Sequence, residues 1–353
     1  MKRLINFGSI EQYRNICSTI KHQSRFIGLD ENDEPLYNNL LDLPVINAIG
    51  SEKIHGTNSG ISYSNLDGLW LQSRNNIIND ISGHMGCGIF INTTKEIWVN
   101  LIKQLASQYN INLNEKIITI YFEWCGENIQ RNSAVSGLSK RAIIFQHFKV
   151  SPIVKNDDII SFWLETKINN MYISNCENNI FNIMNFKTWN IEIDFNKPFE
   201  AQNKMIQIVN DIEPNSPVGQ EFGKEENIGE GIVVTFNYKD NLYKFKVKGE
   251  KHSVTKVKTL NIIDEELENK MIEFANYACK SWRLEQFWNE LFKKEKPEVK
   301  KIGDFLRLVF KDILKEESDV IVKENLDSKK INKYISQICK KWFFEQLNES
   351  ICL

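Results

Sequence analysis

The stretch "SEKIHGTNSGIS", Ser51 to Ser62, places a lysine, a histidine and several small polar residues in apolar surroundings. The runs "PVINAIG" and "GISY" adjoin Lys53 on either side, so this lysine lies at the end of what the pattern predicts to be a buried strand. A core strand would avoid such residues, and a surface turn would not need so much hydrophobic support. The stretch therefore indicates a reactive site, although a lone lysine beside a Gly-Thr turn is usually an ordinary surface residue.

Lys53 has the chemistry of a nucleophile. A free lysine has a pKa of about 10.4 and reacts poorly near neutral pH. Partial burial and neighbouring cations lower that pKa and activate the amine. The residues Gly50, Ser51, Gly56 and Thr57 are small and would let a ligand approach Lys53 closely.

The composition is that of a soluble globular protein with room for two domains. The chain has 353 residues, of which 42% are hydrophobic and 25% charged, and a net charge of -2. Its seven cysteines include no C-x-x-C pair, which favours a reduced cytosolic chain without a structural zinc site. The first residues lack a signal-peptide core, and no apolar run could span a bilayer. We expect a protein without membrane contact, located in the cytoplasm, including that of a phage- or virus-infected cell.

Two patterns divide the chain. Before about Lys258, short apolar runs alternate with turn residues and predict strands, with one helix in "TKEIWVNLIKQLASQY". After about Ile262, apolar residues recur at helical spacing almost throughout. The fold class is therefore α+β, with an N-terminal domain of antiparallel sheets and helices and an all-α C-terminal domain. We predict domains at 1–250 and 263–353 with a linker at 251–262, and some strands and helices in the less informative stretch 156–227.

Three further elements carry charged groups in unusual places. Glu123 lies in the apolar strand "YFEWC", where a carboxylate is rare unless it is paired or faces solvent. Glu230 lies between two glycines in "GEGIVVTF", which is either a hairpin turn or a carboxylate aimed at a lysine or a metal. In "LYKFKVK", alternation places Lys244, Lys246 and Lys248 on one face, as in a phosphate platform or an exposed strand.

The order of these four elements resembles that of the covalent nucleotidyltransferases, which include ATP-dependent ligases and capping enzymes. "EKIHGTN" is similar to the nucleotidyl-lysine motif of the bacteriophage RNA ligase 2 family, which also contains RNA-editing ligases, and has His55 where DNA ligases usually carry Asp. "LQSRNN", "EWCGENIQRN", "EGIVV" and "KFKVKGEKHS" resemble later motifs of that family. "FQHFKV" resembles its aromatic motif, with Lys149 in place of the usual Asp, and "KIGDFLRLVFKDILKEE" resembles part of its C-terminal domain.

The resemblance implies an adenylyltransferase domain with an ATP-grasp-like ligase fold and a three-step reaction. Lys53 would attack the α-phosphate of ATP, the AMP would pass to an RNA 5′-phosphate, and a 3′-hydroxyl would then displace AMP. Catalysis would consist mostly of positioning and electrostatic stabilisation. ATP and Mg²⁺ are the implied cofactors, with Mn²⁺ as a substitute and Glu230 as the metal ligand.

The family's roles transfer to matching positions. The implied catalytic residues are Lys53, Glu230, Lys246 and Lys248. The implied nucleotide site comprises Glu52, Lys53, Ile54, His55, Asn58, Arg74, Glu123, Phe145, Glu230, Lys246 and Lys248. Within it, Phe145 would stack on adenine, Glu123 would accept from the ribose hydroxyls, and Arg74 would contact phosphate.

The resemblance further implies a monomer that joins RNA 3′-OH and 5′-phosphate ends, sealing nicks in duplex RNA during RNA repair. The C-terminal helices would bind the duplex through lysines that could equally be solvated: Lys300, Lys301, Lys329, Lys330, Lys333, Lys340 and Lys341. A DNA ligase or capping guanylyltransferase is the alternative within enzymes. His55 and a helical tail without a recognisable OB-fold disfavour it. A non-catalytic RNA-binding relative is the other alternative, which the presence of all reactive positions disfavours. There is no P-loop that would indicate a fused kinase.

Overall fold

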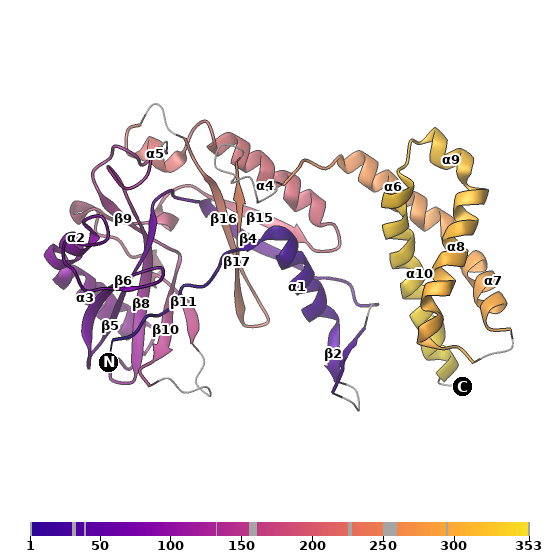
Figure 1. Cartoon of the computed structure of the whole chain (residues 1–353), viewed down its shortest axis with the longest axis horizontal. Helices are drawn as coiled ribbons and strands as arrows, with labels where there is room; N and C mark the ends of the chain where they lie inside the picture. Colours follow the sequence, from indigo (N-terminus) through magenta and orange to yellow (C-terminus); the bar gives the residue numbers. More distant parts are fainter. Residues whose placement is uncertain are drawn as a thin grey trace. The chain divides into compact units, whose positions relative to one another are not determined.

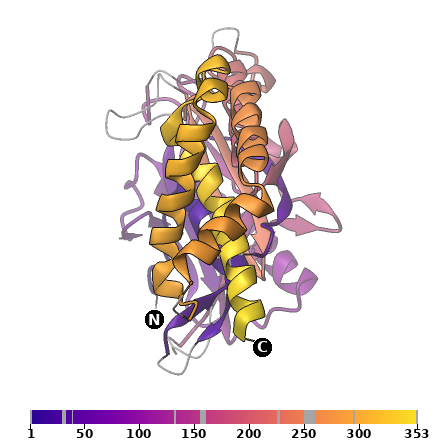
Figure 2. The same ribbon diagram turned by 90° about the vertical axis from the view of Figure 1, so that its right-hand side faces the viewer.

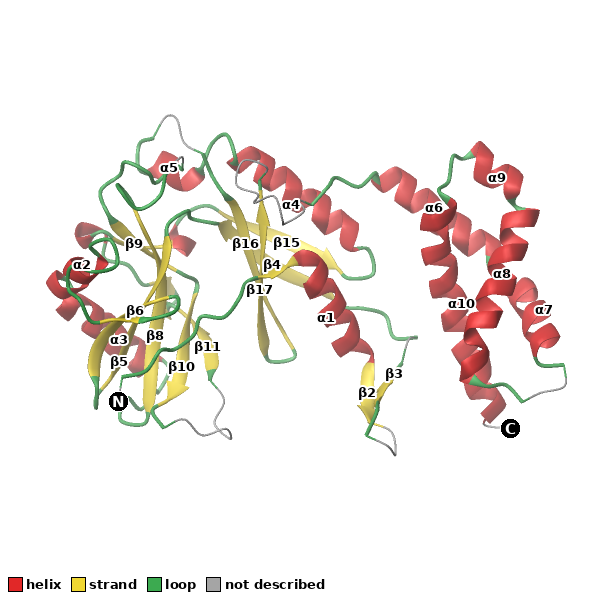
Figure 3. Cartoon of the chain, in the orientation of Figure 1, coloured by secondary structure: helices red, strands yellow, loops and turns green. Residues whose placement is uncertain are grey.

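The computed structural model describes residues 2–29, 33–38, 40–131, 133–154, 161–224, 228–249, 260–293 and 296–351. The chain has a mixed α+β fold, as predicted (Figure 1, Figure 3). It forms two compact units, one of residues 1–16, 46–193 and 203–261 and the other of residues 17–45, 194–202 and 262–353. The predicted domain limits stay a prediction, because most of the predicted linker 251–262 lies outside the described residues.

An eight-stranded sheet forms one wall of the first unit. Its main path has the order β11-β10-β8-β5-β6-β7, and β9 pairs with both β8 and β14. The strands are β5 (Thr57–Ser64), β6 (Gly68–Ser73), β7 (Ile77–Ile78), β8 (Lys116–Cys125), β9 (Arg141–Ile144), β10 (His147–Pro152), β11 (Phe162–Glu165) and β14 (Ile180–Asn182). The "RAIIFQHFKV" run, which alternation presents as one strand, is divided into β9 and β10 at Phe145 and Gln146.

Side-chain alternation gives this sheet one apolar and one functional face. On β8, Ile118, Ile120, Phe122 and Trp124 enter a core with α2 (Cys87–Thr93) and α3 (Lys95–Gln108), which Figure 1 shows beside β5, β6 and β8. The α3 residues Trp98, Ile102 and Leu105 are fully buried there, so the helix predicted from this segment is confirmed. Thr119, Tyr121 and Glu123 alternate with the core residues and point to the other face.

A five-stranded sheet of order β1-β17-β16-β4-β15 carries the lysines of the motifs. Its strands are β1 (Glu11–Gln12), β4 (Val45–Glu52), β15 (Thr188–Asp194), β16 (Gly231–Tyr238) and β17 (Asn241–Lys248). β16 lies between β4 and β17 and pairs antiparallel with both, so Ile232 is opposite Glu52 on one side and Val247 on the other. Phe245 and Val247 are buried, while Lys246 and Lys248 on the alternate face are accessible.

The remaining elements include two amphipathic helices whose positions the sequence pattern did not give. α1 (Tyr13–Arg25) lies in a stretch dominated by polar residues, and α4 (Pro198–Ile212) lies within the stretch 156–227. The stretch 156–227 carries strands and helices, as expected, over its described part. The smaller elements are β2 (Phe26–Leu29), β3 (Pro35–Tyr37), β12 (Lys167–Ile168), β13 (Met171–Tyr172), α5 (Pro217–Glu221) and short 3-10 turns at Cys176–Asn178, Ile183–Asn185 and Val299–Lys301.

From Glu265 onward the described residues are helical, as their spacing predicts. The helices are α6 (Glu265–Ala278), α7 (Ser281–Leu291), α8 (Ile302–Glu316), α9 (Ser318–Lys323) and α10 (Ser328–Ile351), which face the viewer in Figure 2. They enclose one apolar core and a buried guanidinium, Arg283, which pairs with Asp312 and Glu317. Of the lysines proposed for RNA contact, Lys301 is half-buried and the rest are exposed. No described helix is both long and apolar enough to cross a bilayer.

Candidate active site

A cavity of about 410 Å³ lies between the two sheets of the first unit. It is lined by nearly all the residues that the sequence predicted for nucleotide binding: Glu52, Lys53, Ile54, Asn58, Arg74, Glu123, Phe145, Lys246 and Lys248. The two remaining predicted residues are Glu230, which accepts a hydrogen bond from Lys53, and His55, whose Nδ1 lies within hydrogen-bond distance of Glu230. The fold thus gathers side chains that are up to 196 positions apart in the sequence, from Glu52 to Lys248.

Lys53 is fixed at the end of β4 by backbone and side-chain contacts. Its amide donates to the carbonyl of Gly231 (2.8 Å), which continues the pairing with β16 by one residue. Gly231 has φ of 142°, and a Cβ there would lie 2.1 Å from the carbonyl oxygen of Val247. Only glycine fits this position, so the "EGI" sequence is required for β16 to lie between the two lysine-bearing strands.

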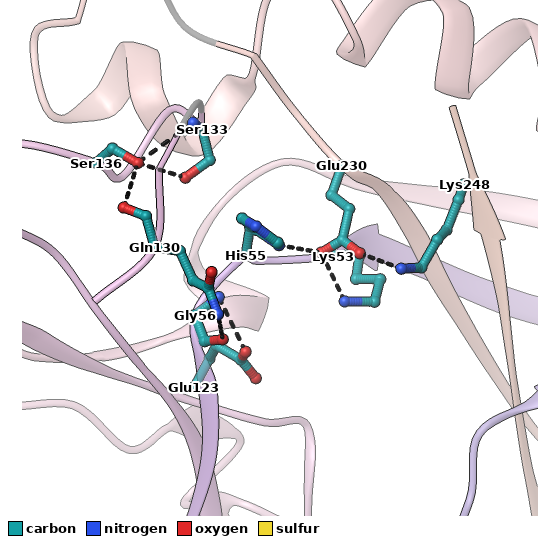
Figure 4. A network of polar contacts seen from close by, with 9 residues as sticks. All are labelled: Lys53, His55, Gly56, Glu123, Gln130, Ser133, Ser136, Glu230 and Lys248. Atoms are coloured by element: carbon teal, nitrogen blue, oxygen red, sulfur yellow. Dashed lines mark hydrogen bonds and ion pairs between the residues drawn. The ribbon is translucent and has the colours of Figure 1, made fainter. Parts of the chain in front are cut away.

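Glu230 joins Lys53 to Lys248 at the end of β17 (Figure 4). Its Oε2 accepts from Lys53 Nζ (2.7 Å) and lies 3.3 Å from His55 Nδ1, and its Oε1 lies 2.5 Å from Lys248 Nζ. Burial alone would raise the pKa of this carboxyl, but the contacts with His55, Lys53 and Lys248 hold it well below its usual range. Glu230 is therefore a carboxylate that fixes two ammonium groups and is a poor proton acceptor.

The peptide of Gly56 is held from both sides. Its amide donates to Glu123 Oε1 (3.0 Å), and its carbonyl accepts from Gln130 Nε2 (3.3 Å), as Figure 4 shows. A Cβ on residue 56 would come within 2.4 Å of the carbonyl oxygen of Trp124, so the close approach to β8 requires glycine. Burial raises the pKa of Glu123 to about 7, against the opposing charge of Lys53.

Gln130 is a site residue that motif reading did not assign a role. It lies in the "GENIQRN" run, and its carbonyl accepts from the hydroxyl of Ser136, which also contacts Ser133. Through Gly56 this loop is connected to the nucleophile motif. The resemblance already contained the glutamine, but only the fold shows that it holds the turn after Lys53.

Glu52 is engaged by the protein itself. Its carboxylate accepts from the Ser216 hydroxyl and from the amide of Val218 (3.0 Å), at the start of α5. Burial raises the pKa of this carboxyl to about 7. Glu52 thus holds α5 at the cavity wall, and a direct contact with nucleotide stays a prediction.

The remaining lining residues give the cavity a polar and an apolar side. Phe145 lies between β9 and β10 with Val233, Ile143 and Ile183 elsewhere on the lining, a set suited to a planar base. Arg74, which follows β6, is exposed at the cavity, and Asn58 lies on β5. Burial and then the charges of Lys248, Lys53 and Arg74 lower the pKa of Lys246. An anion at this side of the cavity would relieve that repulsion.

Lys244 departs from the expectation of an exposed platform. Its ammonium lies 3.5 Å from the ring centroid of Trp163 and 4.7 Å from that of Phe7. Burial, followed by the charge of Lys149, lowers its pKa to about 7. Side-chain alternation therefore predicts the correct face for Lys244. It gives no sign of the aromatic rings, because they come from distant parts of the chain.

The described residues offer few side chains that could bind a metal ion at the cavity. Among the described residues, no group of three or more His, Cys, Asp or Glu side chains could hold an ion. Both oxygens of Glu230 are already taken by lysines and His55. The site does not form a protein-only metal cage, but it fits a divalent ion held chiefly by triphosphate oxygens and water.

Residues 47–258 match the RNA ligase family. Among solved structures, the chain is similar to a Naegleria gruberi RNA ligase with PPi (12% identity, TM-score 0.38, 70% of this chain and 57% of that one) and to an archaeal ATP-dependent RNA ligase (11%, 0.34, 96% and 65%). This chain thus spans little more than half of the Naegleria protein. No curated protein sequence matches it. The family match covers well over half of the chain and includes every cavity residue except those near the N-terminus, and the protein belongs to the RNA ligase family.

Proposed function

We propose that the protein is an ATP-dependent RNA ligase that works through AMP bound covalently to Lys53. The observation that supports this most is the placement of Lys53 Nζ, 2.7 Å from a buried carboxylate whose other oxygen contacts Lys248. This arrangement aims an amine and a second cation at the same point in a nucleotide-sized cavity.

In the first step, the lone pair of Lys53 Nζ attacks the α-phosphorus of ATP. A phosphorus–nitrogen bond forms, the bond to the bridging oxygen breaks, and pyrophosphate leaves as Nζ loses a proton to solvent. Glu230 orients the amine and does not retain the proton, because its lowered pKa makes it a weak base. Lys246 and Lys248 neutralise the charge that develops on the phosphate oxygens.

The next two steps use the same cations. The RNA 5′-phosphate attacks the lysyl-AMP phosphorus and releases Lys53, and a 3′-hydroxyl then attacks the activated phosphate and releases AMP. Each displacement develops charge where Lys246, Lys248 and Arg74 line the cavity. When bound, Mg²⁺ or Mn²⁺ would neutralise the triphosphate oxygens. Glu230 is the carboxylate nearest the nucleophile that could contact the ion by rearranging.

Phe145 and the apolar lining would hold adenine, with Glu123 near the ribose. The nick-sealing role, action as a monomer and a cytoplasmic location complete the proposal. They rest on the resemblance of the motifs and on the lysines of the helical unit.

The experiment is incubation with α-labelled ATP and Mg²⁺, followed by a denaturing gel and then by transfer to nucleic acid. We expect label on the protein, its loss on addition of 5′-phosphorylated nicked RNA duplex, and a sealed product. Matched DNA nicks, single-stranded RNA and labelled GTP separate the ligase from the capping and DNA-joining alternatives. Sealing should fall faster with salt than self-labelling does, because backbone contacts supply much nucleic-acid affinity. A protein that binds RNA but takes no label from any nucleotide would contradict the proposal.

A further inference from the structure

Two lysine ammonium groups lie close to the ring of Trp163 on β11. Lys149 on β10 is directly opposite Trp163 on β11, and its ammonium lies 5.4 Å from the ring centroid. Lys244 on β17 contributes a second ammonium, 3.5 Å from the same ring. Arg3 is close enough for its charge to lower the pKa of Lys149, after the larger effect of burial. We call Lys149 and Lys244 the Trp163 cluster.

No carboxylate compensates the Trp163 cluster in the described part of the chain. Lys149 Nζ donates to the carbonyl of Asn6 (3.0 Å), and Arg3 donates to the carbonyl of Pro152, while Arg3 Nε is buried without a partner. The carboxylate on the same face of β11 is Glu165. It is engaged by three other side chains: Lys167, Tyr172 and Gln146. Converging ammonium groups without a counter-charge are costly, so the cluster is suited to an anion that the protein alone does not supply.

His147 adds a second observation that points to a ligand. This side chain is only 5% exposed, it lines the cavity, and it lies two residues before Lys149 on the same face of β10. Its Nδ1 is buried without a hydrogen-bond partner in the described structure. Burial and the charge of Lys244 keep this imidazole neutral, since they lower its pKa to about 3. A buried polar ring with an unpaired nitrogen, beside unpaired cations, marks an incomplete polar site.

The position of the cluster along β17 distinguishes two sources of phosphate. Lys248 is at the nucleophile, and Lys244 is four residues away, which is about 13 Å along a strand. A triphosphate with its α-phosphate at Lys53 does not reach that far. A polynucleotide whose end reacts at Lys53 continues past Lys246 to Lys244, with one phosphate for every nucleotide.

We propose that Lys149 and Lys244 bind a backbone phosphate of the RNA substrate, next to the nucleotide that reacts, with His147 at its cavity side. This inference rests on the proposed function, since it assigns part of the RNA path. Guanidinium and ammonium groups are the usual phosphate ligands, and contacts to phosphate fix the register of the bound strand. Lys149 and Lys244 both lie within the segment that matches the RNA ligase family, and the match itself gives neither residue a role.

The test measures RNA binding and self-labelling separately, on the full chain. Lys149→Gln and Lys244→Met remove one charge each and keep most of the side-chain stem, and Lys149→Arg restores the charge. The matched control is Lys187→Gln, because Lys187 is exposed and lies 5.6 Å from the ring of Trp189, away from the cavity lining. The readouts are fluorescence anisotropy with a 5′-phosphorylated nicked RNA duplex at several salt concentrations, yield of covalent AMP, inhibition by pyrophosphate, and thermal melting.

We expect Lys149→Gln and Lys244→Met each to weaken RNA binding roughly tenfold at low salt and to reduce the slope of log affinity against log salt by about one. Lys149→Arg should recover most of the affinity. Lys149→Gln and the control should keep the AMP yield and pyrophosphate inhibition of the wild type, and Lys244→Met should lose less AMP yield than RNA affinity. Loss of ATP or pyrophosphate affinity with normal RNA binding would overturn the inference in favour of the triphosphate. Unchanged RNA binding in properly folded variants would overturn it in favour of a purely structural cluster.

Two results keep these outcomes separate from failure of the proposed function. RNA binding by anisotropy does not require AMP transfer, so the subsite is measurable even if no ligation occurs. If Lys244→Met melts early, Lys149→Gln and its arginine rescue decide alone, because Lys149 lies on a strand of the other sheet. A wild-type protein that labels with AMP but binds no RNA contradicts the subsite and leaves the lysyl-AMP step standing.

Discussion

Two groups of lysines lie along strand β17, one at its C-terminal end and one near its middle, and they differ in what balances their charge. At the C-terminal end, Lys53 and Lys248 share the buried carboxylate of Glu230. Near the middle, Lys149 and Lys244 contact aromatic rings and, within the described residues, no carboxylate. The first pair is fixed in place before any ligand arrives, and its charge is already compensated in part.

The difference shows how one residue type serves two purposes on one strand. A carboxylate between two lysine side chains holds both of them in position, as a nucleophile and its phosphate partner require. Aromatic rings position an ammonium without neutralising it, and the pKa of Lys244 is lowered to about 7 as a result of burial and then Lys149. The compensated group is suited to chemistry and the uncompensated group to binding an anion.

The largest expected effect is at the nucleophile. Lys53→Ala should abolish covalent AMP labelling, and Lys53→Arg should as well, because a guanidinium stays protonated. The measurement is labelled AMP on a denaturing gel, with Lys187→Ala as the folded control. Undiminished labelling of either variant at Lys53 would end the assignment of this residue.

Glu230→Gln is the sharpest way to break the contrast between the two groups. It keeps the shape but removes the charge that compensates Lys53 and Lys248, so the rate of self-labelling should fall about 100-fold, as when one preorganised electrostatic contact is lost. Single-turnover labelling at saturating ATP measures this rate. A variant within threefold of wild type would mean that Glu230 has no role in orienting the amine.

Substitutions along β17 compare the two groups directly. Lys246→Ala and Lys248→Ala should each depress self-labelling by at least about tenfold, since both neutralise the phosphate that reacts. Lys244→Ala should affect labelling less, because its ammonium lies by Trp163 and not by Glu230. If Lys244→Ala is the most impaired of the three, the register of the lysine strand has been assigned incorrectly.

The smallest expected effect is a difference in pH dependence between two carboxylates of the site. Glu123 has a folded pKa of about 7 against an ordinary value of 4.5, so its contribution to stability is fully present below about pH 4.5 and is lost as pH rises through 7. Glu230 has a lowered pKa, so its contribution is present above about pH 4.5 and is lost on acidification.

Denaturant unfolding from pH 4 to pH 8 tests both signs. Relative to wild type, the free energy of unfolding of Glu123→Gln should increase as pH rises. The deficit in free energy of unfolding of Glu230→Gln relative to wild type should be smallest at the acid end. Glutamine at 123 can still accept from the Gly56 amide through its carbonyl oxygen. Parallel curves for wild type and Glu123→Gln would show that the burial of this carboxyl has no effect on its titration.

Much of the fold and site was predictable, because the motifs carry local information. The lysine at the end of β4, the glycines around Glu230 and the alternation of Lys246 and Lys248 each follow from neighbouring residues in the sequence. The helix of residues 95–108 and the helices after residue 264 were visible in their apolar spacing. The order of the motifs then placed them in one site through the resemblance to RNA ligases.

The missed features depend on partners far away in the chain. The aromatic rings around Lys244 are those of Phe7 and Trp163, and no sequence pattern near residue 244 predicts them. The sequence gives no sign of a protein partner for Glu52, but its carboxylate accepts hydrogen bonds from the Ser216 hydroxyl and the Val218 amide. The helix α1 has many polar residues, so its apolar positions are too few to stand out in the sequence.

The pairing of β16 between β4 and β17 also determines when, during refolding, the contact between Lys53 and Glu230 can form. Lys53 and Glu230 are 177 residues apart, so their contact requires closure of a very long loop, which carries an entropic cost and slows assembly. The helical part of the chain depends mainly on nearby contacts and can regain its secondary structure sooner. After dilution from denaturant, helical circular dichroism should therefore return before the capacity to take up AMP. The proposed covalent labelling of Lys53 would in this sense report that the first unit has finished refolding.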